Sequence, residues 1–410
     1  MCESQDQSGT PDLSPLPYHR AIREYLKTEE ADIWRWYASH KVREEQADAV
    51  RFDLLKSTYR VDRQTQPEIY AAAEDVAARL SLDVPITIYQ AQNPAGPNAS
   101  LAYVPGEAHV VLHGSITSKL ADVEVRALLA HELSHLKLWQ QWDGDYLIVD
   151  QILAALTHDR AAETPHFASA RLFGLYSEIF CDRGSLAAAD DPLVVVAMLV
   201  KVSTDLEKVS AESYLRQAEE IFSKKATKAA DVSHPESFIR ARAIKLWSDG
   251  DSRADAKIEE MIEGAAALDN LDLLAQTKVS ALTRRLLDVF LSPKWIQSDP
   301  VGAHARLFFE DYVLGEGPHE DRSLADDIKT DDKPMRDYYC YVLLDFVTAD
   351  RDLEEFPLAA ALALTEKYGL KDRFAEIAKR ELRLRKKQLG KIDKDKQNLL
   401  AKAGQRFKST

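Results

Sequence analysis

The feature that most constrains this chain is the segment His131-Glu132-Leu133-Ser134-His135. Two histidines four residues apart lie on one face of an α-helix, so both imidazoles can reach a single ion. Zinc sites use this spacing, and a carboxylate beside the first histidine, as in Glu132, can polarise a metal-bound water. Asp122 is a suitable N-cap for a helix through this segment. The other interpretation is an ordinary amphipathic helix that carries these side chains.

A third ligand is expected on the next long helix, predicted over residues 168–188. A catalytic zinc ion needs three protein ligands and one open position, and Glu178 is the candidate. Asp182 lies one turn further on the same face, where a carboxylate can accept the second N–H of a ligating histidine. Both acids would otherwise be solvated helix charges. Cys181 is interpreted as an inert buried thiol, with an oxidation or inhibition point as the alternative.

Hydrophobic periodicity predicts a mostly helical α+β protein. Strand patterns occur before residue 120, at residues 84–89, 99–103 and 108–112. Helical spacing prevails after Asp122. The predicted architecture is a small sheet packed on the metal-binding helix, followed by an all-helical domain. The strand over residues 108–112 is the candidate edge on which an extended peptide would pair.

Composition divides the chain of 410 residues into four segments. A disordered tail over residues 1–18 precedes a first domain over 19–250, a helical domain over 253–378 and a basic tail over 379–410. The basic tail carries 12 Lys and Arg against 3 acids, and the whole chain has a net charge of −14. The tail is interpreted as a helical extension that covers the acidic body, with an anionic membrane surface or a nucleic acid as the second alternative.

Charge and hydropathy also exclude several classes of protein. A net charge of −14 argues against a general nucleic-acid-binding protein. The longest apolar run is eight residues, Leu193–Val200, whereas a membrane span needs about 20. The acidic N-terminus has no apolar signal segment, and three scattered cysteines make no disulfide framework. We therefore expect a cytoplasmic protein without transmembrane segments.

Several segments spread over residues 54–247 carry a family resemblance. They are Thr58-Tyr59-Arg60, Gln66-Pro67-Glu68-Ile69-Tyr70, Val84-Pro85, Asn98-Ala99, Val110-Val111-Leu112, the histidine motif, Glu178 with Asp182-Arg183-Gly184, and His234-Pro235 with Arg240 and Arg242. In this order they resemble the HtpX and CAAX-prenyl-protease type zinc metallopeptidases, a gluzincin group, and in particular their soluble bacterial members. Ser134 stands where the family usually has Gly, and Cys181 where it usually has Ala.

The resemblance implies a zincin-type domain and a zinc-dependent metalloendopeptidase that acts on peptides or proteins. One zinc ion per chain would be held by His131, His135 and Glu178. Glu132 would be the general base and then a proton shuttle. Asp182 would accept a hydrogen bond from a ligating histidine and so support it.

Four further residues receive roles from the same resemblance. His234 would return to the site, either to stabilise the oxyanion or to occupy the open zinc position, unless it belongs only to a helix-cap region. Arg240 would bind substrate, or form a structural ion pair instead. Asn98 and Ala99 would belong to the substrate-binding segment.

The second domain has a shorter resemblance. Residues 338–368, with Asp350-Arg351-Asp352 between two apolar helices, are similar to TerB-like helical domains of tellurite and stress systems. The acids around this turn would form either a metal-binding patch or a solvated turn. The alternative function of the chain follows from this domain. It is a latched or inactive peptidase scaffold that acts as a stress-related interaction protein through the helical domain.

Overall fold

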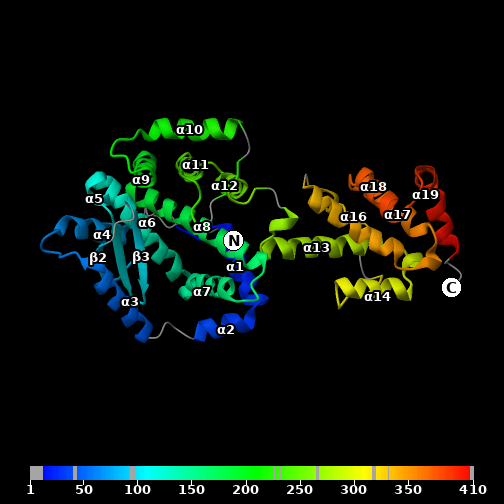
Figure 1. The fold of residues 1–410 in the computed structure, drawn as a ribbon, viewed down its shortest axis with the longest axis horizontal. Helices are drawn as coiled ribbons and strands as arrows, with labels where there is room; N and C mark the ends of the chain where they lie inside the picture. Colours follow the sequence, from blue (N-terminus) through cyan, green and yellow to red (C-terminus); the bar gives the residue numbers. More distant parts are fainter. Residues whose placement is uncertain are drawn as a thin grey trace, which may run out of the picture. The chain divides into compact units, whose positions relative to one another are not determined.

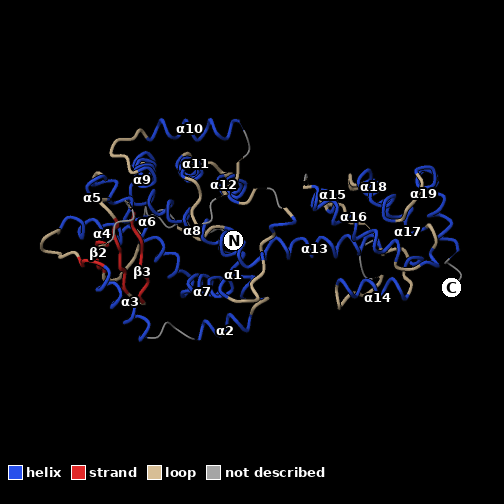
Figure 2. Tube along the Cα trace, viewed as in Figure 1, coloured by secondary structure: helices blue, strands red, loops and turns tan. Residues whose placement is uncertain are grey.

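The computed structural model describes residues 13–39, 44–92, 96, 98–224, 227–230, 233–264, 267–315, 320–330 and 332–406. The chain forms two compact units, Met1–Gly264 and Ala265–Thr410. Figure 2 shows the strands together in the first unit, whereas the second is helical. The prediction of a mostly helical α+β fold with a small sheet is confirmed. No helix of the described ranges is both long and apolar enough to cross a membrane.

The first unit consists of a sheet and the helices that surround it (Figure 1). Its elements are α1 (Pro17–Thr28), α2 (Ala31–Ser39), α3 (Glu44–Ser57), β1 (Thr58–Arg60), α4 (Pro67–Arg79), β2 (Ile86–Ala91), β3 (Asn98–Val104), β4 (Glu107–His113), α5 (Ile116–Lys119), α6 (Asp122–Gln140), α7 (Asp145–His158), α8 (Thr164–Ala189), α9 (Pro192–Thr204), α10 (Ala211–Lys224), α11 (Ser237–Ser248) and α12 (Ala254–Ile262). The first unit extends past the sequence boundary near Gly250 because α12 packs on α11 and α8.

The sheet has the strand order β1-β2-β4-β3. β2 and β4 are parallel, and the two outer pairs are antiparallel. The strand over residues 108–112 is therefore central, and its prediction as the edge strand is wrong. The turn at Gly106, with a φ of 74°, folds β4 back between β3 and β2. The edge strand on this side is β3.

The two faces of the sheet pack against different helices. Leu54 of α3 packs with Tyr89 and Val111 on one face. Side chains alternate along a strand, so the fully buried Ile88 and Val110 lie on the opposite face. α4 and α6 contact the sheet as well. Helix α6, which carries the histidine motif, is thus placed directly beside β3 and β4.

α6 and α8 pack against each other, and a glycine of α8 lies at their contact. A Cβ atom at Gly184 would lie 1.9 Å from Oγ of Ser134 and 2.8 Å from its Cβ. Ser185 Oγ also donates a hydrogen bond to the carbonyl of Ala127, at 2.8 Å, from one helix to the other. Because the two helices lie so close together, short side chains on their facing sides can contact each other.

The N-terminal segment is ordered from Leu13 onward, which corrects part of the predicted disordered tail. Leu13, Leu16 and Tyr18 are buried. The ring of Tyr18 stacks on Tyr176 with centroids 4.9 Å apart. Apolar burial outweighs the Ser, Pro and Gly content of this segment. Residues 1–12 lie outside the described residues.

The second unit is a separate helical body with its own core. Its helices are α13 (Leu273–Phe290), α14 (Asp299–Phe308), α15 (Leu324–Asp327), α16 (Lys333–Thr348), α17 (Phe356–Lys367), α18 (Lys371–Glu381) and α19 (Lys386–Arg406). Basic residues 379–406 are part of this body, because Leu389, Leu399 and Ala403 of α19 are buried in its core. Lys396 of α19 also forms an ion pair with Glu366, at 3.0 Å. Residues 407–410 lie outside the described residues.

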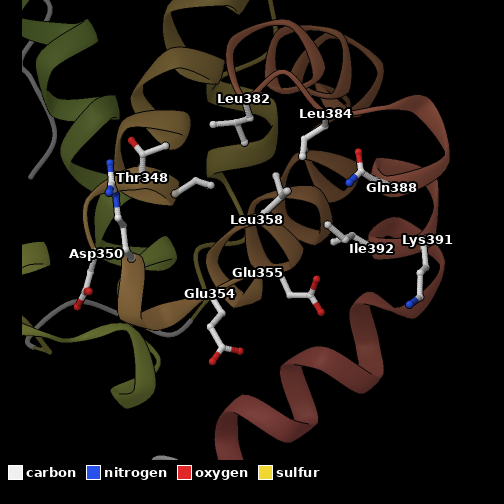
Figure 3. Close-up of a pocket in the computed structure, with 12 residues that line it drawn as sticks. Thr348, Asp350, Glu354, Glu355, Leu358, Leu382, Leu384, Gln388, Lys391 and Ile392 are labelled. Atoms are coloured by element: carbon white, nitrogen blue, oxygen red, sulfur yellow. The ribbon is translucent and has the colours of Figure 1, made fainter.

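The second unit contains a groove of about 640 Å³ beside the acidic turn. Figure 3 shows Leu358, Leu384 and Ile392 among its lining, with Glu355 and Lys391 near its rim. Within the turn, the carboxylate of Asp350 accepts a hydrogen bond from the backbone N–H of Asp352, and Glu354 pairs with Arg406. These partners belong to the chain itself, as expected for a structural turn.

Candidate metal centre

α6 places two imidazoles on one face, as the four-residue spacing predicts. The ring centroids of His131 and His135 lie 5.4 Å apart. His131 is buried, and 21% of the His135 side chain is exposed. Burial lowers the pKa of His135 to about 4, so its imidazole is neutral at pH 7 and has a lone pair for a metal.

Glu178 of α8 lies opposite these imidazoles. Its Oε2 is 3.3 Å from Nε2 of His131, and its Oε1 is 3.6 Å from Nε2 of His135. Burial alone would raise the pKa of this carboxyl, but the charges of His131 and Arg240 hold it below its usual range. The structure thus brings together the three residues that the sequence analysis selected as ligands.

Asp182 lies one helical turn beyond Glu178, behind His131. Its Oδ1 is 3.2 Å from Nδ1 of His131, and its side chain is fully buried. Burial disfavours a charged imidazole, but Glu178 and the hydrogen bond with Asp182 outweigh it and raise the pKa of His131 to about 10. His131 thus carries a proton on each ring nitrogen, on Nδ1 facing Asp182 and on Nε2 facing Glu178, and a metal ion would take the place of the Nε2 proton.

Arg240 of α11 binds the two carboxylates rather than open solvent. Its Nε and Nη2 donate to both oxygens of Asp182, at 2.7 and 2.6 Å. Its Nη1 lies 3.4 Å from Oε2 of Glu178. This fork geometry favours the ion-pair alternative for Arg240 over substrate binding.

Glu132 follows His131 directly in the sequence. Its side chain is buried and lines the same cavity as the two histidines. Burial raises the pKa of its carboxyl to about 7. A carboxyl with a pKa near the working pH can both take up and release a proton, which suits a general base that later acts as an acid.

His234 also reaches this site, on the segment before α11. Its Nε2 lies 3.7 Å from Oε1 of Glu178, nearly as close as Nε2 of His135. Its side chain is 55% exposed, and its Nδ1 is 2.9 Å from Oγ of Ser233. The segment therefore does bring a third imidazole toward Glu178.

Cys181 is a donor that the sequence analysis treated as inert. It is fully buried, and ligand atoms of His131, His135 and Cys181 lie within 4.8 Å of one another. Burial raises the pKa of its thiol well above the ordinary value, which favours the neutral form. Cys181 follows Glu178 by three residues, so both lie on the same face of α8, the face toward α6. This spacing is the signal by which the sequence could have pointed to Cys181.

These residues line one cavity of about 380 Å³. β3 contributes Asn98, Ala99, Ser100 and Leu101, α6 contributes Leu128, His131, Glu132, His135 and Trp139, α9 contributes Met198, Leu199 and Val202, and Glu178, His234 and Arg240 complete the wall. The cavity thus lies between the edge strand β3 and helix α9. The spacing of the sequence motifs does not indicate that apolar residues of α9 line this cavity.

The donor atoms gathered in this site fit a cation. Oε2 of Glu178 is buried and accepts no hydrogen bond within the described part of the chain. The nearest positive groups to this oxygen are Nε2 of His131, at 3.3 Å, and Nη1 of Arg240, at 3.4 Å. Two imidazoles beside such a carboxylate are a ligand set that zinc prefers.

Comparison with known proteins gives the family of this region. Residues 63–248 match the model of "Peptidase family M48". This segment spans α4 to α11 and includes both α6 and α8. Residues 63–248 form a peptidase family M48 domain. The predicted resemblance to the HtpX and CAAX-protease type is thereby confirmed for this domain.

The M48 domain has a distant curated relative in Arabidopsis thaliana. That protein is named "Plastoglobule-localized metallopeptidase 48, chloroplastic" and is 28% identical over 213 residues. The match covers 46% of this chain and 59% of the relative, so it leaves a large part of each protein unmatched. No solved structure matches this chain.

Proposed function

We propose that the M48 domain is a zinc-dependent metalloendopeptidase that binds one zinc ion per chain. The observation that carries this proposal is the convergence of His131, His135 and Glu178 in a cavity that also holds Glu132. Three such ligands leave one position for water or substrate. Metal analysis of the purified protein, together with its hydrolysis of casein, tests the proposal directly.

The chain's own residues would divide the work of hydrolysis. When bound, zinc would polarise the scissile carbonyl and lower the pKa of a water molecule to about 7. Glu132 takes a proton from the attacking water and then passes it to the leaving amine. Asp182, held by Arg240, keeps the ring of His131 in one orientation and one tautomer.

Among the described residues, no strand pairs with the outer edge of β3, and this supports binding of an extended substrate. Asn98 and Ala99 lie on this edge and line the cavity, so a peptide can pair with their backbone next to Glu132. A carboxypeptidase also needs a positive group for the terminal carboxylate of its substrate. Among the described lining residues the permanent cation is Arg240, and Asp182 and Glu178 engage it. This arrangement supports cleavage within a chain.

Replacement of Glu178 by Ala is expected to lower zinc occupancy strongly, because two histidines are an incomplete site. Zinc per chain after dialysis measures the effect. The matched control is Phe167→Ala, which removes an exposed side chain from the same helix. Full zinc content in the Glu178→Ala protein would exclude this residue as a ligand.

Replacement of His234 by Ala is expected to raise peptide turnover. Its Nε2 is about as close to Glu178 as that of His135, so we propose that His234 closes the open zinc position as a fourth ligand. Turnover by wild type and the variant, at equal zinc content, measures this. A fall of roughly 10²–10³-fold would instead assign His234 to the oxyanion, and an unchanged rate would leave it a structural role.

The alternative function is a latched scaffold that acts as a stress-related interaction protein. The position of His234 favours a latch, and the second unit has its own core and groove for a partner. We also propose that the second unit is a TerB-like domain and that the protein is cytoplasmic. We expect no nucleic-acid partner, and we propose that the basic segment contacts an anionic surface. A protein that binds zinc but hydrolyses nothing even as His234→Ala would support the scaffold.

A further inference from the structure

The second unit contains a further pocket, of about 470 Å³, between three of its elements. Its lining comes from one face of α13, from residues 327–330 at and after the end of α15, and from the first two turns of α16. A volume of this size lies in the range of small-molecule sites, about 300–1,000 Å³. The pocket shares no lining residue with the metal centre or with the groove of Figure 3.

The floor of this pocket is apolar. Leu282 of α13, Ile328, and Met335 and Tyr339 of α16 line it and are buried. Val279 is half-buried and packs against the same core. Because these side chains belong to the core of the second unit, the floor is a preformed surface. An apolar group that enters the pocket would leave water favourably.

The rim of the pocket is positively charged. Lys278 of α13 and Lys329, after α15, line the pocket and are exposed. Neither ammonium group forms an ion pair with another described residue. The acid that lines the same pocket, Asp327, is engaged elsewhere, because its Oδ2 accepts a hydrogen bond from Nη1 of Arg285, at 2.7 Å. Two available cations therefore stand beside one neutralised carboxylate.

Two further carboxylates lie next to the pocket and cap its helices. Asp272 accepts a hydrogen bond from the backbone N–H of Ala275 at the start of α13, at 2.9 Å. Asp332 does the same for the N–H of Met335 at the start of α16, at 2.8 Å. The positive end of each helix macrodipole balances its capping carboxylate. The two lysines thus set the charge that a ligand meets.

We propose that this pocket binds a small anionic amphiphile, with its apolar body on the floor and its carboxylate or phosphate head between Lys278 and Lys329. A neutral apolar ligand would leave both ammonium groups without a partner. A purely polar anion would leave the apolar floor in contact with water. An amphiphile satisfies both parts, and its charged head forms charge-assisted hydrogen bonds with the lysines. The site is independent of the metal centre and of the proposed peptidase activity.

Isothermal titration calorimetry of the full-length zinc-loaded protein tests the pocket with decanoate, decyl phosphate and decanol. The anions are expected to bind about 10-fold more tightly than decanol, which has the same apolar body without the charge. The tighter anion identifies the head group. Octanoate, which is two methylenes shorter, is expected to bind about 10-fold more weakly than decanoate. Absence of saturable binding of both anions, or equal affinity for decanol, would overturn the proposal.

Charge variants localise the binding. Lys278→Glu combined with Lys329→Glu is expected to weaken anion binding by about 10-fold or more and to leave decanol binding unchanged. The matched control, Lys294→Glu with Lys402→Glu, makes the same change at two exposed lysines outside the pocket and is expected to bind as wild type. An anion held by zinc in the M48 domain would be unaffected by either pair. Unchanged affinity in the Lys278 and Lys329 variant would therefore overturn the site.

A variant of the floor tests the apolar part. Val279→Phe fills the pocket and is expected to weaken decanoate and decanol alike, by about 10-fold or more. Val313→Phe is the control, because it makes the same change at an exposed position outside the pocket. The unfolding midpoint without ligand shows whether each variant is folded. If Val279→Phe does not fold, Val279→Ala removes contacts from the floor and is expected to weaken decanoate binding. Wild-type affinity in a folded Val279 variant would contradict the proposal.

Discussion

Replacement of Glu132 by Gln is expected to abolish peptide hydrolysis while zinc binding and the fold remain. The amide has the size of the carboxylate but cannot accept the proton of the attacking water, so turnover should fall by at least about 10²–10⁴-fold. Glu132 is buried and is not one of the proposed ligands. We therefore expect the zinc content per chain and the thermal unfolding midpoint to stay near wild type. Casein turnover, in contrast, should be lost.

The matched control changes a carboxylate elsewhere on the same helix. Asp122 is the exposed first residue of α6, and Asp122→Asn is expected to keep wild-type turnover. Wild-type turnover in Glu132→Gln itself would refute the role of Glu132 as general base. Loss of zinc in Glu132→Gln would show that the side chain contributes to metal binding instead.

Replacement of Gly184 by Ala is expected to destabilise the M48 domain and to weaken zinc binding. The new Cβ would lie 1.9 Å from Oγ of Ser134 and 2.8 Å from its Cβ, so α6 and α8 must separate or shift. Overpacking of this kind costs about 1–3 kcal/mol. The same displacement moves Glu178 away from His131 and His135. Denaturant unfolding and zinc titration measure the two effects.

A second substitution in the facing helix is expected to restore both properties. The two nearest contacts of the new Cβ belong to the side chain of Ser134, and the next is the carbonyl oxygen of Ala130, at an ordinary 3.8 Å. Ser134→Gly removes the clash at a cost of about 1 kcal/mol in helix propensity or less. The double variant should be more stable than Gly184→Ala alone, since coupling between contacting sites reaches about 0.5–3 kcal/mol. Additive losses would contradict direct contact between these positions.

Much of the candidate site was predictable because helices have a regular period. Four-residue spacing put His131 and His135 on one face of α6, and the same rule put Glu178 and Asp182 on one face of α8. Strand periodicity located β2, β3 and β4 within a few residues. β1 was missed because three residues are too short for a period to be recognised.

Other features depend on contacts between distant segments and had no local signal. The engagement of Arg240 by Asp182 joins α11 to α8, and sequence alone left its two alternatives open. The burial of α19 in the second unit likewise overrides a composition that is typical of a solvated tail. Charge on the outer face of a helix does not report what its inner face contacts.

By itself, the sequence determined the types of the candidate ligands and the helices that carry them, because side-chain identity and helical period are local properties. Only the tertiary structure decided which strand has a free edge, how closely α6 and α8 approach, and that apolar residues of α9 line the cavity. β4 became central because β2 and β3 both pair with it, a choice made over long sequence separations. The distance between Ser134 and Gly184 reflects the packing of two helices, which no single stretch of sequence specifies.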